Sequence, residues 1–97
     1  MLYAIMVRDR DDTELLRQQH RDGHMAHFSK HKDRIALAGP LSADDGHSLG
    51  SLVIFDAEHE GEASAFIRAD PYHHSGVWLE PVVARFKGSI FAPEKFF

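Results

Sequence analysis

The sequence has no cysteine among its 97 residues. This absence excludes disulfide bonds, thiolate catalysis and cysteine-ligated metal sites. No apolar run approaches the roughly 20 residues that a membrane-spanning helix needs, so we expect no contact with a membrane. The N-terminus also lacks the basic start, long apolar core and cleavage site of a secretory signal, and we therefore expect a cytoplasmic protein.

A surplus of positive charge is missing as well. Eleven Lys and Arg residues stand against 15 Asp and Glu residues, which gives a net charge of −4. Because nucleic-acid binding depends on neutralising phosphates, we expect no nucleic-acid partner. A glycine-rich phosphate loop, a GxSxG nucleophile elbow and an HExxH zinc motif are absent too. The residues left to carry chemistry are carboxylates and eight histidines.

The length and composition fit one globular domain that spans residues 1–97. Hydrophobic residues make up 43% of the chain, which argues against disorder. A domain of this size buries only roughly 60–65% of the surface that its unfolded chain exposes. Self-association would increase the buried surface, and we expect a homodimer or a higher homo-oligomer.

Runs of β-forming residues alternate with helix-forming segments in the order β-α-β-β-α-β. The expected strands are residues 2–8, 35–41, 50–56 and 77–87, and the expected helices are residues 13–34 and 57–69. This order is typical of α+β, ferredoxin-like folds, with two helices on one face of a four-stranded antiparallel sheet. The other face needs a cover, and at this length a second subunit could supply it.

Single residues predict the irregularities of this pattern. Asp12 is the expected N-cap of the first helix. Gly23 in its middle predicts a kink or a break into two helices. Pro71 should end the second helix and begin a loop over residues 71–76. Pro81 places the last strand at an edge or at a bulge.

Two apolar groups should pack against other parts of the structure. The second helix should direct three residues into the core, namely Ala63, Phe66 and Ile67. The C-terminal residues 88–97 carry three aromatic side chains, namely Phe91, Phe96 and Phe97. So much apolar surface predicts that this tail packs on its own subunit or on a neighbour.

Four histidines of the first helix share a spacing of four, three and four residues: His20, His24, His27 and His31. A continuous helix would place all four along one face. One interpretation is a metal site, because histidines at i and i+4 can share an ion. The other, which we favour, is a mixed face with one functional histidine and no metal. We expect the remaining histidines to be solvated or simple loop residues: His27, His31, His47, His59, His73 and His74.

The segment Asp70-Pro71-Tyr72 is the second candidate for chemistry. Side chains at the end of a helix and the start of a loop often point into clefts, and Tyr72 offers an apolar ring with a hydroxyl. The alternative is a turn that ends the helix, in which Asp70 binds nearby backbone.

Several short elements together resemble the YciI-like (YCII-related) family. They are Arg21-x-x-His24, Ala38-Gly39-Pro40-Leu41, Gly50 before an apolar strand, and Asp70-Pro71-Tyr72 with Gly76. The resemblance implies a ferredoxin-like fold that pairs as a dimeric α/β barrel, with an active site built on His24 and Asp70. The chain departs from the family where Asp22-Gly23 follows Arg21, because proline is frequent at that point. One branch of the family resembles a dehydrochlorinase acting on a chlorinated hydroxyquinone, and muconolactone isomerases share the fold, but a shared fold does not carry activity.

An imidazole with a carboxylate on one ring nitrogen can transfer protons at neutral pH through the other nitrogen. We expect His24 to be the general acid and base, with Asp70 orienting it and no cofactor. Such a pair suits elimination or isomerisation next to a carbonyl of a small substrate. The expected substrate contacts are Arg21 for an anionic group, and Tyr72 or backbone N–H groups near Gly39 and Ser48 for a carbonyl. The alternatives are a module that binds a small molecule without turnover and an accessory subunit of a pathway.

Overall fold

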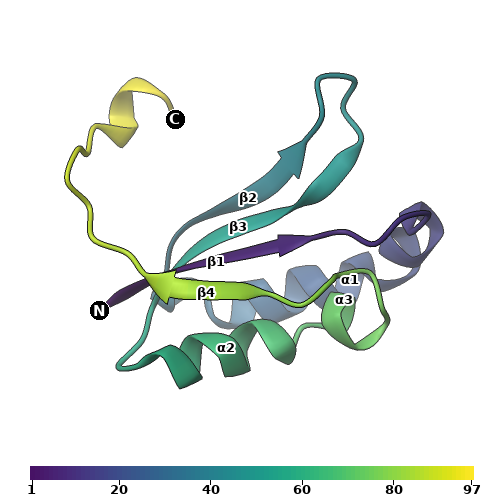
Figure 1. Cartoon of the computed structure of the whole chain (residues 1–97), viewed down its shortest axis with the longest axis horizontal. Helices are drawn as coiled ribbons and strands as arrows, with labels where there is room; N and C mark the ends of the chain where they lie inside the picture. Colours follow the sequence, from purple (N-terminus) through teal and green to yellow (C-terminus); the bar gives the residue numbers. More distant parts are fainter.

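The computed structural model describes residues 1–97, apart from the side chain of Pro93. Its elements are β1 (Leu2–Arg8), α1 (Glu14–Lys30), η1 (Lys32–Arg34), β2 (Ile35–Ser42), β3 (Ser48–Asp56), α2 (Glu60–Arg68), α3 (Pro71–His74), β4 (Val82–Arg85) and η2 (Pro93–Lys95). The strands form one antiparallel sheet in the order β2-β3-β1-β4. All three α-helices lie on one face of this sheet (Figure 1). The predicted ferredoxin-like α+β fold is confirmed.

The core lies between the sheet and the helices. Alternate residues of β1 point toward the helices, and Tyr3, Ile5 and Val7 are buried there. Val53 and Phe55 of β3 lie on the same face and are fully buried. The three core residues predicted for the second helix are buried in α2: Ala63, Phe66 and Ile67. The alternation of strand residues thus predicts the buried face of the sheet.

The opposite face of the sheet is apolar and uncovered within this chain. Its side chains line a shallow hollow of about 580 Å³. The exposed hydrophobic residues of this hollow are Met6, Leu41, Leu49, Leu79 and Val82. An apolar patch of this kind is typical of a surface that another molecule covers.

The first helix runs without interruption over Glu14–Lys30, so the predicted break into two helices at Gly23 is wrong. A Cβ atom at Gly23 would lie 3.0 Å from Cγ of Pro71. Glycine therefore lets α1 approach α3 closely without breaking the helix. The predicted N-cap is also wrong, because Asp12 has a left-handed φ of 59° and Thr13 occupies the cap position. No helix in the described chain is long and apolar enough to cross a membrane.

Two boundaries near the site differ from the prediction. Residues expected to form a loop instead begin with the short helix α3, because the Asp70 side chain caps it and Pro71 occupies its first turn. The last strand is shorter than expected, since β4 contains only Val82–Arg85. Pro81 has no N–H group to donate and immediately precedes this strand, which forms one edge of the sheet as predicted.

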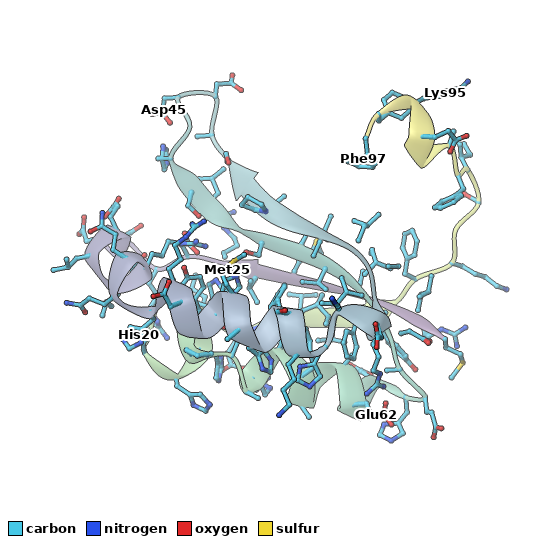
Figure 2. All side chains as sticks on the ribbon, turned by 180° about the vertical axis from the view of Figure 1, so that it is seen from behind. His20, Met25, Asp45, Glu62, Lys95 and Phe97 are labelled. Atoms are coloured by element: carbon cyan, nitrogen blue, oxygen red, sulfur yellow. The ribbon has the colours of Figure 1, made fainter. Side chains whose placement is uncertain are left out.

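The C-terminal tail does not pack on its own subunit, which corrects one of the two expectations for it. Phe91, Phe96 and Phe97 are 80–92% exposed. The tail leaves β4 and turns to the side of the sheet away from the helices, as both views show (Figures 1 and 2).

Candidate active site

His24 and Asp70 meet although 46 residues separate them in the sequence. His24 projects from the middle of α1, and its Nδ1 atom lies 2.7 Å from Oδ2 of Asp70. Asp70 has no exposed surface and caps α3, where its Oδ1 accepts a hydrogen bond of 2.8 Å from the N–H of Tyr72. When Asp70 is ionised it can only accept hydrogen bonds, and Nδ1 of His24 is then the donor. The lone pair of the neutral ring is then on Nε2.

Aromatic rings hold the imidazole in place. The His24 ring stacks on Tyr72 with centroids 4.2 Å apart and planes inclined by 12°. Phe28 contacts it at 4.6 Å, and Trp78 meets it edge-on at 5.7 Å. The side chain of His24 remains 13% exposed. Packing and the bond to Asp70 together fix the orientation of the ring.

The partly exposed side of His24 borders a cavity of about 320 Å³ between α1 and the sheet. Figure 2 shows Met25 on the side of α1 toward the β2–β3 hairpin, and Met25 is one of the lining residues. The cavity is lined by Arg17, Arg21, His24, Met25 and Phe28 of α1, Ala38, Gly39 and Pro40 of β2, Ser51 of β3, and Tyr72 of α3. Asp70 lies behind His24 and does not line the cavity.

Two arginines at the cavity differ in what binds them. Arg17 forms a two-pronged ion pair with Asp9, at 2.9 and 3.0 Å, and its guanidinium lies 4.8 Å from the centre of the Tyr72 ring. Among the arginines of the described chain, Arg17, Arg34 and Arg68 form ion pairs, whereas Arg21 forms none. Arg21 is also exposed, so its positive charge is available to an anionic ligand.

The Tyr72 hydroxyl already has a partner in this site. It donates a hydrogen bond of 3.2 Å to the carbonyl oxygen of Arg17. Burial raises the pKa of Tyr72 above its usual value of 10.0, against the smaller opposing effect of the Arg17 charge. The hydroxyl is therefore protonated at neutral pH and links α3 to α1.

The structure brings five of the six predicted site residues together: His24, Asp70, Arg21, Gly39 and Tyr72. Ser48 lies elsewhere, in a separate cavity of about 440 Å³ beside the β1–α1 loop. The serine that borders the His24 cavity is Ser51, which the prediction missed. Alternation in the expected strand contained this signal, because Ser51 has the same parity as Val53 and Phe55.

The other histidines of α1 turn to different partners. Nε2 of His27 lies 2.7 Å from the carbonyl oxygen of Phe66, and Nδ1 of His31 lies 2.9 Å from that of His27. The expectation that these two side chains are only solvated is therefore wrong. His59 is exposed, but it caps α2 by accepting from the N–H of Glu62. Among the described residues, no group of three or more potential ligands is placed to hold a metal ion.

Comparisons with known proteins find relatives of this chain over most of its length. Residues 1–87 match the YCII-related domain. The chain is 35% identical to Protein YciI of Escherichia coli, over 90% of this chain and 97% of that protein. An uncharacterised protein of Haemophilus influenzae is 30% identical over the same shares.

A solved structure is similar as well. It is the 5-chloro-2-hydroxyhydroquinone dehydrochlorinase TftG of Burkholderia phenoliruptrix, in complex with 2,5-dihydroxybenzoquinone. The two structures superpose with a TM-score of 0.79 and share 29% sequence identity, over 90% of this chain and 94% of that one. The match of residues 1–87 and the identity to Protein YciI show that this chain belongs to the YCII-related domain family.

Proposed function

We propose that this protein is a cofactor-free enzyme of the lyase or isomerase type, in which His24 and Asp70 transfer a proton on a small cyclic carbonyl compound. The observation that carries the proposal is the 2.7 Å contact between Nδ1 of His24 and buried Asp70, beside a cavity that His24 itself lines. A base of this kind needs no further group to abstract a proton at neutral pH.

In the first step, Nε2 of His24 removes a proton from the carbon next to the substrate carbonyl. The electron pair of the broken C–H bond moves toward the carbonyl oxygen and leaves an enolate, while the imidazole becomes imidazolium. Asp70 stabilises this cation through the bond to Nδ1. In elimination, the electron pair then forms a carbon–carbon double bond as an anionic group leaves, and the imidazolium gives its proton to water. In isomerisation, His24 returns the proton to a different carbon.

The size and lining of the cavity support a small, flat substrate. About 320 Å³ accommodates one ring with a few substituents, and Met25, Phe28 and Pro40 offer apolar contacts. Arg21 supplies a positive charge at the border, which favours an anionic group. Gly39 has no side chain, so its backbone forms part of the cavity wall. The ligand and the named substrate of TftG are each a single six-membered ring with oxygen substituents, and the ligand is a cyclic carbonyl compound.

The test compares the wild-type protein with the His24→Gln variant. Both are incubated in D₂O with 5-chloro-2-hydroxyhydroquinone and with a panel of cyclic hydroxyketones and unsaturated lactones. Chloride release and deuterium incorporation are followed by an ion-selective electrode and by NMR. We expect the wild-type protein to accelerate one of these reactions and the variant to lose roughly 10²- to 10⁴-fold of that rate.

Circular dichroism checks that the His24→Gln variant remains folded. Unchanged turnover in a folded variant would exclude His24 as the base. A wild-type protein that binds members of the panel but turns over none would instead favour a binding module.

A further inference from the structure

We infer that the hydroxyl of Ser51 binds the carbonyl oxygen of the substrate on the wall of the cavity opposite His24. This inference rests on the proposed function and adds to it the group that receives the negative charge of the enolate. It also explains a polar side chain in a position where the sheet otherwise carries core residues.

Ser51 reaches the site from the sheet, whereas His24 reaches it from α1. Ser51 pairs with Val7 of β1 and with Pro40 of β2, near the middle of the sheet. Its side chain lies on the helix-facing side, as those of Val53 and Phe55 do. Since Ser51 and His24 line the same cavity, a flat ligand between α1 and the sheet would contact both.

Ser51 is largely buried as a residue, and its hydroxyl forms no side-chain hydrogen bond within the described chain. Three polar residues of the described chain are buried, namely Thr13, Ser51 and Asp70. Thr13 donates to the carbonyl oxygen of Arg10, and Asp70 binds both His24 and the N–H of Tyr72. Ser51 is only 7% exposed, yet no such bond ties its hydroxyl to a described residue. The cavity is where a ligand could supply the missing partner.

The chemistry of the proposed reaction gives this hydroxyl a role. Proton abstraction moves negative charge onto the carbonyl oxygen, and a hydrogen-bond donor fixed at that oxygen binds the enolate more strongly than the ketone. The Tyr72 hydroxyl already donates to the carbonyl oxygen of Arg17, so it is committed elsewhere. Ser51 has its proton available for the substrate.

The test compares Ser51→Ala with Ser48→Ala, which is the same change on the same strand but at the neighbouring cavity. The probe is 2,5-dihydroxybenzoquinone, the ligand of the similar TftG structure. Binding is followed by quenching of Trp78, the single tryptophan, which lies against the His24 ring. We expect Ser51→Ala to weaken binding roughly 3- to 10-fold and to lower turnover further, while Ser48→Ala binds as the wild type does.

Thermal unfolding separates a ligand-binding role from a structural one. If Ser51 serves the ligand, Ser51→Ala keeps the melting temperature of the wild type or raises it. Equal binding by Ser51→Ala and wild type, or a loss of binding that parallels a loss of folding, would overturn the inference and leave the His24 proposal intact. A wild-type protein that neither binds the quinone nor turns over any compound of the panel would overturn both.

Discussion

At the scale of single residues, Asp70 is the group on which the state of His24 depends. Asn at this position keeps the size of the side chain, and its oxygen can still accept from the N–H of Tyr72. The NH₂ group of the asparagine would then face Nδ1 of His24. Because an NH₂ group donates, Nδ1 would have to accept, and the proton of the neutral ring would move to Nε2. We expect Asp70→Asn to lower the catalytic rate roughly 10²- to 10⁴-fold with the fold preserved.

The matched control for this change is Asp45→Asn. Asp45 also contacts a histidine, since its Oδ1 lies 2.6 Å from Nδ1 of His47, but both side chains are exposed on the β2–β3 hairpin. We expect the Asp45→Asn variant to turn over substrate at the wild-type rate under the same conditions. Equal activity of both variants would contradict the role given to Asp70.

Tyr72 predicts how stability depends on alkaline pH. Burial raises the pKa of its hydroxyl in the folded protein above the value of 10.0 expected in the unfolded chain. The folded state therefore binds the Tyr72 proton more tightly than the unfolded chain does. The stability that this protonated hydroxyl contributes is fully present below pH 10 and is lost as the pH rises through the pKa of the folded state. Urea unfolding at pH 8 and pH 11 should show a smaller loss of stability for Tyr72→Phe than for wild type. An equal loss in both proteins would contradict the prediction.

At the scale of elements, the contact between α1 and α3 depends on Gly23. Alanine in an exposed helix interior normally stabilises by about 1 kcal/mol relative to glycine. Here the added Cβ would lie 3.0 Å from Cγ of Pro71, so we expect Gly23→Ala to destabilise the protein by about 1 kcal/mol and to lower activity.

The control for Gly23→Ala is the same change in a Pro71→Ala background. Removal of the proline ring should relieve the contact, so that alanine becomes stabilising by roughly 0.5–1 kcal/mol. Chemical denaturation of the four proteins measures this coupling. An equal effect of the alanine in both backgrounds would show that the approach of the two helices does not require glycine.

The elements themselves were largely predictable from local patterns. The strands beginning near residues 2, 35 and 50 follow from runs of β-forming residues, and the core positions of α2 from helical spacing. The errors arose where tertiary contacts decide the backbone, as with Gly23 against Pro71 and the cap of α3 by Asp70.

The site was less accessible to local reasoning. His24 and Asp70 lie 46 residues apart, and no spacing rule joins them; the family resemblance suggested the pair, and the structure places the two side chains in contact. Ser51 could have been found from strand alternation alone. Ser48 could not have been excluded, because its position depends on an irregular register between β2 and β3 near Leu41.

At the scale of the whole molecule, we propose that a second copy of the chain covers the apolar face of the sheet. This face carries Met6, Leu41, Leu49, Leu79 and Val82, and the aromatic tail lies on the same side (Figure 1). A charge at the centre of such an interface would be buried without a partner. We therefore expect the wild-type protein to sediment as a dimer and Met6→Glu to sediment as a folded monomer at micromolar concentration.

Leu15→Glu is the control for this prediction. Leu15 is 65% exposed on α1, which lies on the opposite side of the sheet from the proposed interface. This variant should remain dimeric. Wild-type protein that sediments as a monomer at all concentrations would exclude the second copy as the cover of this face.

The proposed mechanism depends most on the tautomer of the His24 ring and on the access of this ring to the cavity. Nitrogen-15 NMR of the histidine side chains, with the His24 signal assigned by its loss in His24→Gln, measures both. The proposed mechanism predicts that the neutral form of the ring carries its proton on Nδ1, and that the Nε2 signal shifts when 2,5-dihydroxybenzoquinone is added. A neutral ring protonated on Nε2 instead, or an Nε2 signal that saturating quinone leaves unchanged, would contradict it.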